Sequence, residues 1–329
     1  MVIIMIDYSK CPLYKLTSKK QLKRLLNIND NRFLKQDFLV TQFSPYIDRK
    51  GKPRLIEPPR KEVKIIQRRI KRMLNIIDFP DNVFSGVPKR SYAQNASYHA
   101  ENPIKSMYKI DLRGFFPSIS RNTVYNFFLQ ELLCSPDIAK ILTNLTTVDI
   151  EKANSIDLEQ IHLFLKSKKI KCTNHLISGA PTSQILSYLV NQNMFNDLQA
   201  ISDANRIKMS IYVDDVTFSG NCHISNRFRQ QVLNIVKKYN YNVSKEKIKF
   251  YTKDYPKTVT GVVISSNNKT KISNHIQHAI ISDFRVLKSN PNDDNTKKRL
   301  IGYLSAARQV DKTAFQGIYN YVFPKKSKK

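Results

Sequence analysis

The chain has 329 residues, of which 41% are hydrophobic, 8 are glycine and 4 are cysteine. This length and composition predict a globular protein with a substantial core, built as one multi-part domain or as two to three subdomains. Lys and Arg number 55 against 26 Asp and Glu, which gives a formal net charge of +29. An excess of this size favours a polyanionic partner, first of all nucleic acid, and excludes a surface that is basic only for solubility.

Apolar runs and cysteine spacing limit the class further. The sequence contains no run of about 18 apolar residues, so we expect no membrane span. Residues 1–7 lack a basic segment and a cleavage site, so we expect no signal peptide. The cysteines lie far apart without CxxC spacing, which predicts neither a zinc site nor a disulfide framework and favours a cytoplasmic location.

The first 80 residues look mainly helical. Ser18 is suited to cap a helix from Lys19 to Leu26, and residues 62–77 carry apolar side chains at helical spacing. Between these helices, residues 43–56 are strand-like around the turn Arg49-Lys50-Gly51.

Strand and helix then alternate from residue 108 to residue 264. Residues 208–213 are rich in β-branched and aromatic side chains, and residues 216–220 form a second short strand that ends at a glycine. From Ser273 onward the tail is mostly helical, with a loop at residues 290–295 between two helices.

Two consecutive acids, Asp214 and Asp215, follow Tyr212-Val213 at the turn between those two strands. A tight turn would push both carboxylates out of one edge of a sheet, and Asp111 upstream supplies a third. Three carboxylates suit two Mg²⁺ ions, because Mg²⁺ prefers oxygen ligands. The alternative is an acidic surface turn without chemistry.

These pieces, read in order, resemble a reverse transcriptase over roughly residues 40 to 320. Asp111 with Phe115-Phe116-Pro117-Ser118 is similar to the first palm motif of that family, and residues 178–183 are similar to its QGAPTS segment. The resemblance implies an α+β, right-hand polymerase with helical and β fingers, a palm with an antiparallel sheet, and a helical thumb. The implied divisions are residues 1–104 for the N-terminal helices and fingers, 105–120 for the first part of the palm, 121–175 for fingers and a helical insertion, 176–268 for the second part of the palm, and 269–329 for the thumb with a basic tail.

The same resemblance assigns roles. It implies that Asp111, Asp214 and Asp215 bind two Mg²⁺ ions, and that Lys247 protonates the leaving pyrophosphate, although Lys245 and Lys249 are neighbours and any of these could be a solvated charge. Phe116 would exclude a ribose 2′-hydroxyl, while Phe115 packs in the core. The implied nucleotide-binding residues are Lys52, Arg54, Phe116, Gly179, Ala180, Pro181 and Tyr212.

Two further strings point to one branch of the family. Asn95-Ala96-Ser97-Tyr98-His99 matches the NAxxH signature of retron reverse transcriptases, and Val259-Thr260-Gly261 matches their VTG signature. The alternatives are a satisfied core histidine at His99 and a palm strand that ends at a glycine turn. The resemblance implies RNA-binding roles for Asn95, His99, Val259, Thr260, Gly261, Tyr303 and Arg308.

By this resemblance the chain would copy a cognate structured noncoding RNA from dNTPs. Synthesis would start on a guanosine 2′-hydroxyl and give branched multicopy single-stranded DNA (msDNA), with a separate effector protein in an anti-phage defence set. Two rival readings stay open: a reverse transcriptase of the group II intron or diversity-generating kind, and an RNA-binding scaffold that restrains a toxic effector.

The sequence departs from the family pattern at three places. Ser178 stands where Gln is usual, and Arg113-Gly114 stands where an acidic residue is common. Residues 136–171 are longer than expected before the QGAPTS-like segment, which predicts an added helical element that contacts RNA or a partner protein.

Overall fold

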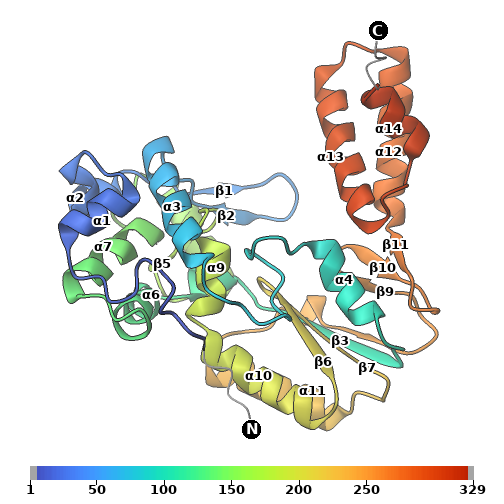
Figure 1. Ribbon diagram of the computed structural model, residues 1–329, viewed down its shortest axis with the longest axis horizontal. Helices are drawn as coiled ribbons and strands as arrows, with labels where there is room; N and C mark the ends of the chain where they lie inside the picture. The colour runs from blue at the N-terminus through green and yellow to red at the C-terminus, as the bar shows by residue number, and fades with distance from the viewer. Residues whose placement is uncertain (1–5, 325–329) are drawn as a thin grey trace.

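The computed structural model describes residues 6–324, which form a helical part, a central sheet part and a C-terminal bundle (Figure 1). The predicted lysine run at 325–329 and the first five residues lie outside this range. Within residues 6–324, no helix is both long enough and apolar enough to cross a membrane.

The helical part corresponds to the predicted fingers. Ser18 caps its first helix by accepting a hydrogen bond from Gln21 N, which confirms the predicted start of α1. The hairpin of β1 and β2 pairs Tyr46 with Ile56 and confirms the strand-turn-strand prediction. The elements are α1 (Lys19–Leu26), η1 (Asn31–Leu34), α2 (Gln36–Val40), β1 (Tyr46–Asp48), β2 (Arg54–Ile56), α3 (Lys61–Leu74), α6 (Arg121–Asn126), η2 (Phe127–Glu131), α7 (Pro136–Thr146), β4 (Thr147–Asp149), α8 (Leu158–Ser167) and β5 (Asn174–Leu176).

The central part corresponds to the predicted palm. Its four-stranded sheet has the order β6-β7-β3-β8 with every neighbouring pair antiparallel. The elements are α4 (Tyr92–Ala100), β3 (Ser106–Asp111), α5 (Phe115–Ser118), α9 (Ser183–Leu189), α10 (Gln192–Ala204), β6 (Lys208–Tyr212), β7 (Asp215–Gly220), α11 (Asn226–Lys238), η3 (Lys245–Lys247), β8 (Lys249–Tyr251), β9 (Lys257–Val259), β10 (Val262–Ile264) and β11 (Thr270–Ile272).

The two faces of this sheet differ in chemistry, because successive side chains of a strand point to opposite faces. One face is apolar: Phe218 of β7 meets Phe228 of α11 with ring centroids 5.5 Å apart. The other face is polar, and α4 covers only one of its ends. The polar side chains on it include Lys109, Asp111, Ser210, Asp215, Thr217 and Ser219.

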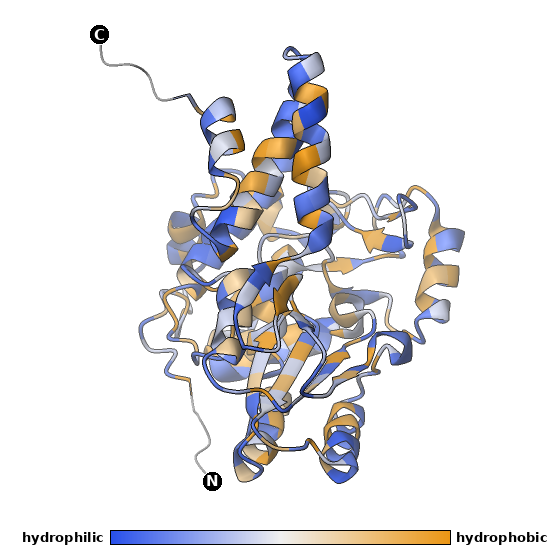
Figure 2. Ribbon diagram, turned by 90° about the vertical axis from the view of Figure 1, so that its right-hand side faces the viewer, coloured by the Kyte–Doolittle hydropathy of each residue, from blue (hydrophilic) through white to orange (hydrophobic). Residues whose placement is uncertain are grey.

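The C-terminal bundle corresponds to the predicted thumb. It consists of α12 (Asn274–Ser289), α13 (Asp294–Val310) and α14 (Gln316–Val322), which confirms the helical tail and the loop near residue 290. The bundle projects from the body (Figures 1 and 2), and its apolar residues form a small core of their own around Leu300 and Leu304.

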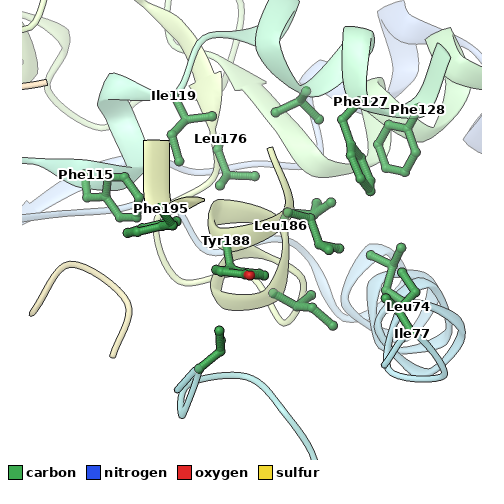
Figure 3. Packing of buried hydrophobic residues seen from close by; sticks show 14 of the residues in the cluster. Leu74, Ile77, Phe115, Ile119, Phe127, Phe128, Leu176, Leu186, Tyr188 and Phe195 are labelled. Carbon is green, nitrogen blue, oxygen red and sulfur yellow. The ribbon is translucent and has the colours of Figure 1, made fainter. Parts of the chain in front are cut away.

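One large apolar core joins the helical and sheet parts. Figure 3 shows Phe115 and Phe195 beside Tyr188 of α9, with Leu186 between them and the α3 end at Leu74. Tyr188 and Phe195 stack with ring centroids 5.5 Å apart. The QGAPTS-like segment therefore begins a helix that is anchored in the centre of the molecule.

The stretch 136–171 is not purely the added helical element that was expected. Its first helix, α7, has Ile138, Leu142 and Leu145 fully buried, so it is an integral part of the main core. β4 follows and pairs with β5. Only α8 lies at the periphery, and it packs beneath the β1–β2 hairpin through Ile161 and other apolar side chains.

The division at residue 268 runs through a small sheet. β10 pairs with β9 on one side and with β11 on the other, so the strand at Thr270–Ile272 joins the central part to the bundle. The helix α4, within the range assigned to fingers, packs on the sheet through His99. The five divisions remain a prediction. We expect the boundary at residue 268 and the assignment of α4 to the fingers to be the parts of it that change.

Candidate active site

The acidic hairpin is built on a strained two-residue turn. Tyr212 pairs with Asp215 across it, so Val213 and Asp214 form the loop. Val213 has φ of +59°, a conformation that is costly for a β-branched residue and that recurs at functional sites. Leu112 N donates a 2.8 Å hydrogen bond to Asp214 O, which fixes the turn against the end of β3.

The strand register brings the third acid to the same edge. Asp111 at the end of β3 lies directly opposite Asp215 of β7. Ser244 Oγ and Lys247 Nζ donate to the two oxygens of Asp111 at 2.9 and 2.7 Å. The predicted Lys247 therefore lies in the site and in contact with a predicted ligand.

Lys109 is a residue that the sequence reasoning missed. Its Nζ donates to Asp215 Oδ2 at 3.0 Å, and its side chain is only 13% exposed. Thr217 Oγ1 faces the other oxygen of Asp215 at 3.3 Å. A sequence signal existed, because Lys109 lies two residues before Asp111 and therefore on the same face of β3. Ser244 had no such signal.

The electrostatics of this edge favour a cation. Burial, followed by the charge of Asp111, raises the pKa of Asp214 to about 6, although Lys247 opposes the shift. The nearby positive charge therefore offsets only part of the cost of ionising Asp214, and a bound cation would offset more of it. The oxygen donors of Asp111 and Asp214 are of the kind that Mg²⁺ prefers, so the residues fit a divalent ion.

The three acids do not converge on one point. Among residues 6–324, no group of three His, Cys, Asp or Glu side chains is arranged to hold a metal ion. Asp215 pairs with Lys109, and Asp111 pairs with Lys247. The two lysines thus neutralise part of the negative charge at the edge.

The predicted phosphate-binding residues lie on the β1–β2 hairpin. Lys52 and Arg54 are both exposed, beside the turn at Gly51, which has φ of +93°. Exposed cations on a hairpin can reach a triphosphate, and Arg can pair phosphate oxygens bidentately.

The loop before α9 presents backbone in the open. Gly179 is exposed with φ of +100°, and a Cβ there would meet nothing within 4 Å. Pro181 is half-buried, and Ala180 is only 7% exposed with its methyl group in the core, so a nucleotide contact at Ala180 would involve its backbone and stays a prediction. Tyr212 is half-buried beside the acidic turn.

The two aromatic residues after Asp111 have different surroundings. Phe115 is buried against Phe195 and Tyr241, which confirms its core role, whereas Phe116 is half-buried and stacks on Phe115. A Cβ on Gly114 would lie 2.6 Å from Ile170 Cδ1, and Gly114 has φ of +54°. The positive φ favours glycine at this position, whereas the Ile170 side chain could shift away from a Cβ.

The side chains of Asn95 and His99 are buried in this structure, so the prediction that they contact RNA directly is wrong. His99 is 1% exposed, with Nδ1 and Nε2 each 2.7 Å from the hydroxyls of Ser219 and Ser210, and burial lowers its pKa to about 3. Asn95 is also fully buried. The alternative of a satisfied core histidine is the correct one.

The VTG residues form the hairpin turn between β9 and β10. Val259 is buried and pairs with Val262, and Thr260 and Gly261 both have positive φ, as the tightest hairpins require. Val259 therefore cannot contact RNA, whereas Gly261 is exposed. Thr260 Oγ1 donates to Tyr92 O at 2.7 Å, so the turn is attached to the start of α4.

The same tyrosine reaches the bundle. The hydroxyl of Tyr92 donates to the carbonyl of Ala306 in α13. The two signature strings thus meet in one joint between the sheet part and the C-terminal bundle. Tyr303 is half-buried, and Arg308 lies over the ring of Tyr319 at 4.0 Å while donating to Ala314 O.

The sheet has facing carboxylates at one edge, with a basic hairpin and a helical bundle on either side. This arrangement is typical of a nucleotide-polymerising enzyme of the right-hand type. Residues 35–283 match the family described as "Reverse transcriptase (RNA-dependent DNA polymerase)". The chain belongs to the reverse transcriptase family and is an RNA-directed DNA polymerase, and its α+β fold is confirmed by this match.

The curated relatives are retron enzymes, in agreement with the predicted branch. The chain is 26% identical to the retron Ec83 reverse transcriptase of Escherichia coli over 76% of this chain and 77% of that protein. It is 25% identical to the retron Se72 reverse transcriptase of Salmonella heidelberg and 26% identical to the retron Mx65 reverse transcriptase of Myxococcus xanthus, over 59% and 66% of this chain and 45% and 49% of those proteins.

Among solved structures, the chain is similar to telomerase from Candida albicans in complex with an RNA fragment. The TM-score is 0.47 at 11% identity, over 86% of this chain and 56% of the telomerase chain. The chain therefore spans little more than half of that protein.

Proposed function

We propose that this reverse transcriptase serves a retron: it copies a cognate structured RNA into msDNA, starting on a guanosine 2′-hydroxyl of that RNA. The support is the pair of signature strings together with the retron enzymes among the relatives. The net charge of +29 suits a chain that holds RNA template and primer in one place.

In the proposed mechanism Asp111, Asp214 and Asp215 bind two Mg²⁺ ions. Mg²⁺ at these carboxylates would activate the attacking hydroxyl and neutralise charge on the phosphates. Asp214 has to be ionised to act as a ligand. Asp215 has to release Lys109, which currently pairs with it at 3.0 Å.

The remaining site residues are proposed to bind the incoming dNTP. Lys52 and Arg54 hold the triphosphate, the Gly179 backbone lies along the nucleotide, and Phe116 and Tyr212 border its sugar. Lys247 is proposed to give a proton to the leaving pyrophosphate, and its 2.7 Å contact with Asp111 supports this role.

We further propose that the enzyme works in the cytoplasm with a separate effector protein, as part of an anti-phage set. Thr260, Gly261, Tyr303 and Arg308 are the predicted RNA contacts that remain half-buried or exposed. We retain them as proposed contacts to the cognate RNA.

The test is to express the gene with its native flanking DNA and to examine total nucleic acid on a denaturing gel. We expect a small single-stranded DNA whose mobility shifts after RNase and debranching treatment, and which is absent with Asp214→Asn. A protein that extends an annealed primer on RNA but makes no branched product would favour the intron-like or diversity-generating kinds. If the Asp214→Asn protein makes no DNA but still supports anti-phage defence, that result would favour the scaffold role.

A further inference from the structure

A carboxylate and an imidazole form a fully buried pair outside the acidic edge. Glu57 Oε1 lies 2.8 Å from His175 Nε2, and both side chains are 0% exposed. Lys, Glu, Arg and Asp are almost never fully buried unless they are paired. Neither residue has a role in the site described above.

The remaining polar atoms of the pair are also engaged. Glu57 Oε2 accepts from Ser178 N at 2.6 Å, and His175 Nδ1 lies 3.2 Å from the carbonyl of Cys172. A carbonyl can only accept, so Nδ1 is the donor in this contact, and Nε2 faces the Glu57 carboxyl group. Each of the four polar atoms of the pair therefore has a partner within the protein.

The pair joins segments that are far apart in the sequence. Glu57 follows β2 directly, three residues after Arg54, and its backbone N donates to Ser178 O at 3.0 Å. Ser178 precedes the exposed Gly179. The β1–β2 hairpin is thus bonded at two points to the loop that opens α9, and Glu57 also holds His175.

His175 continues the connection to the sheet part. It forms an isolated antiparallel bridge with Ser120, and Leu176 N donates to Ile119 O at 2.9 Å. These residues follow α5, which carries Phe116. Three segments proposed to contact the dNTP therefore meet around one buried carboxyl–imidazole pair.

We propose that Glu57 and His175 are positioning residues for nucleotide binding, which fix the Arg54 hairpin, the Gly179 loop and the Phe116 helix relative to one another. This inference rests on the proposed roles of those three segments. If the pair served only stability, substituting Glu57 or His175 would lower the melting temperature of the protein without changing its affinity for dNTP.

The chain provides a matched control. Glu151 and His162 form a second carboxylate-imidazole pair, with Oε1 and Nε2 3.3 Å apart, but these side chains are 46% and 42% exposed. The variant Glu151→Gln removes the same charge from an exposed pair whose two side chains bond to each other and not to the Arg54 hairpin, the Gly179 loop or the Phe116 helix.

The experiment uses the full-length protein with a primer annealed to an RNA template, and it measures KM for dNTP, kcat and the Kd for primer-template. For Glu57→Gln we expect KM for dNTP to rise about tenfold, with kcat and the Kd for primer-template within about twofold of the unsubstituted protein. For Glu151→Gln we expect no change in any of the three. An unaltered KM in folded Glu57→Gln, or a loss confined to kcat, overturns the proposal.

A second variant covers the case in which Glu57→Gln does not fold. Glu57→Leu with His175→Leu replaces the pair by apolar side chains, which proteins often tolerate when both partners are removed together. We expect this double variant to fold and still to show the raised KM, because Ser178 N has lost its acceptor. A normal KM overturns the proposal. If the unsubstituted protein does not extend the primer, the proposed function fails before this inference is tested.

Discussion

The two ends of one sheet face differ in what covers them. At one end α4 lies over β6 and β7, and His99 satisfies the hydroxyls of Ser210 and Ser219 in a closed, neutral network. At the other end Asp111, Asp214 and Asp215 are half-buried, and their charge is partly offset by Lys109 and Lys247. The comparison teaches that a polar strand face becomes structural where a helix seals it and stays available for chemistry where none does.

The largest effect is expected at the open end. Asp214→Asn keeps the size of the side chain but removes a proposed metal ligand, so RNA-directed DNA synthesis should fall by about a thousandfold or more. Primer extension on an RNA template measures this loss, with RNA binding measured in parallel. Asp254→Asn, at an exposed position, is the control. Comparable synthesis by both variants would show that the open end is not catalytic.

The second prediction separates Lys247 from its neighbours. Removing a proton donor in contact with Asp111 should lower kcat for Lys247→Ala by about a hundredfold. Lys245→Ala changes the same net charge in the same short helix and should stay within about threefold. Equal losses in single-turnover experiments would assign the effect to general charge and not to this lysine.

The closed end predicts a pH effect on stability. Burial holds the pKa of His99 at about 3, below its value of about 6.5 in an unfolded chain. The unfolded state therefore binds the additional proton, and the free energy of unfolding should fall by up to about 1.4 kcal/mol per pH unit as pH drops from 6.5 towards 3.

His99→Gln should remove that contribution. The variant loses about 1–3 kcal/mol at pH 7, because the two serine hydroxyls are left poorly paired, but its stability should depend less on pH between 6.5 and 3. Urea titrations at several pH values measure both effects. His275→Gln, at an exposed position, should keep the original pH dependence. An unaltered slope in His99→Gln would mean that another group titrates.

The smallest effect is expected at the joint with the bundle. Tyr92→Phe deletes only the hydroxyl that donates to Ala306 O, which should cost about 1 kcal/mol or less. We expect faster amide hydrogen exchange in α12 and α13 while exchange in β6 and β7 stays unchanged. Uniformly faster exchange would show that the bundle and the sheet part open together.

Local patterns in the sequence were sufficient for several elements. The Ser18 cap of α1 and the β-branched and aromatic residues of β6 and β7 depend on neighbours within a few residues, and the predicted helix start and strand pair are confirmed. The acids could be placed at one edge because a short turn and a strand end fix them. Asp111 and Asp215 lie opposite one another in register as a result.

Contacts between residues that are far apart in the sequence could not be predicted from local patterns. Ser244 reaches Asp111 across 133 residues, and His99 reaches Ser219 across 120. Whether His99 faces RNA or the core depends on α4 lying on the sheet, which no local pattern encodes. The signature string was informative about the family, but its histidine acts in the structure through packing.

The account depends most on the claim that the open end of the sheet binds a divalent cation. Crystals grown with Mn²⁺ and a primer-template, measured at a wavelength with anomalous scattering from manganese, test it directly. We predict an anomalous peak in contact with the carboxylates of Asp111 and Asp214, with Lys247 displaced from Asp111. No peak at these carboxylates, with Lys109 and Lys247 still paired to Asp215 and Asp111, would contradict the account.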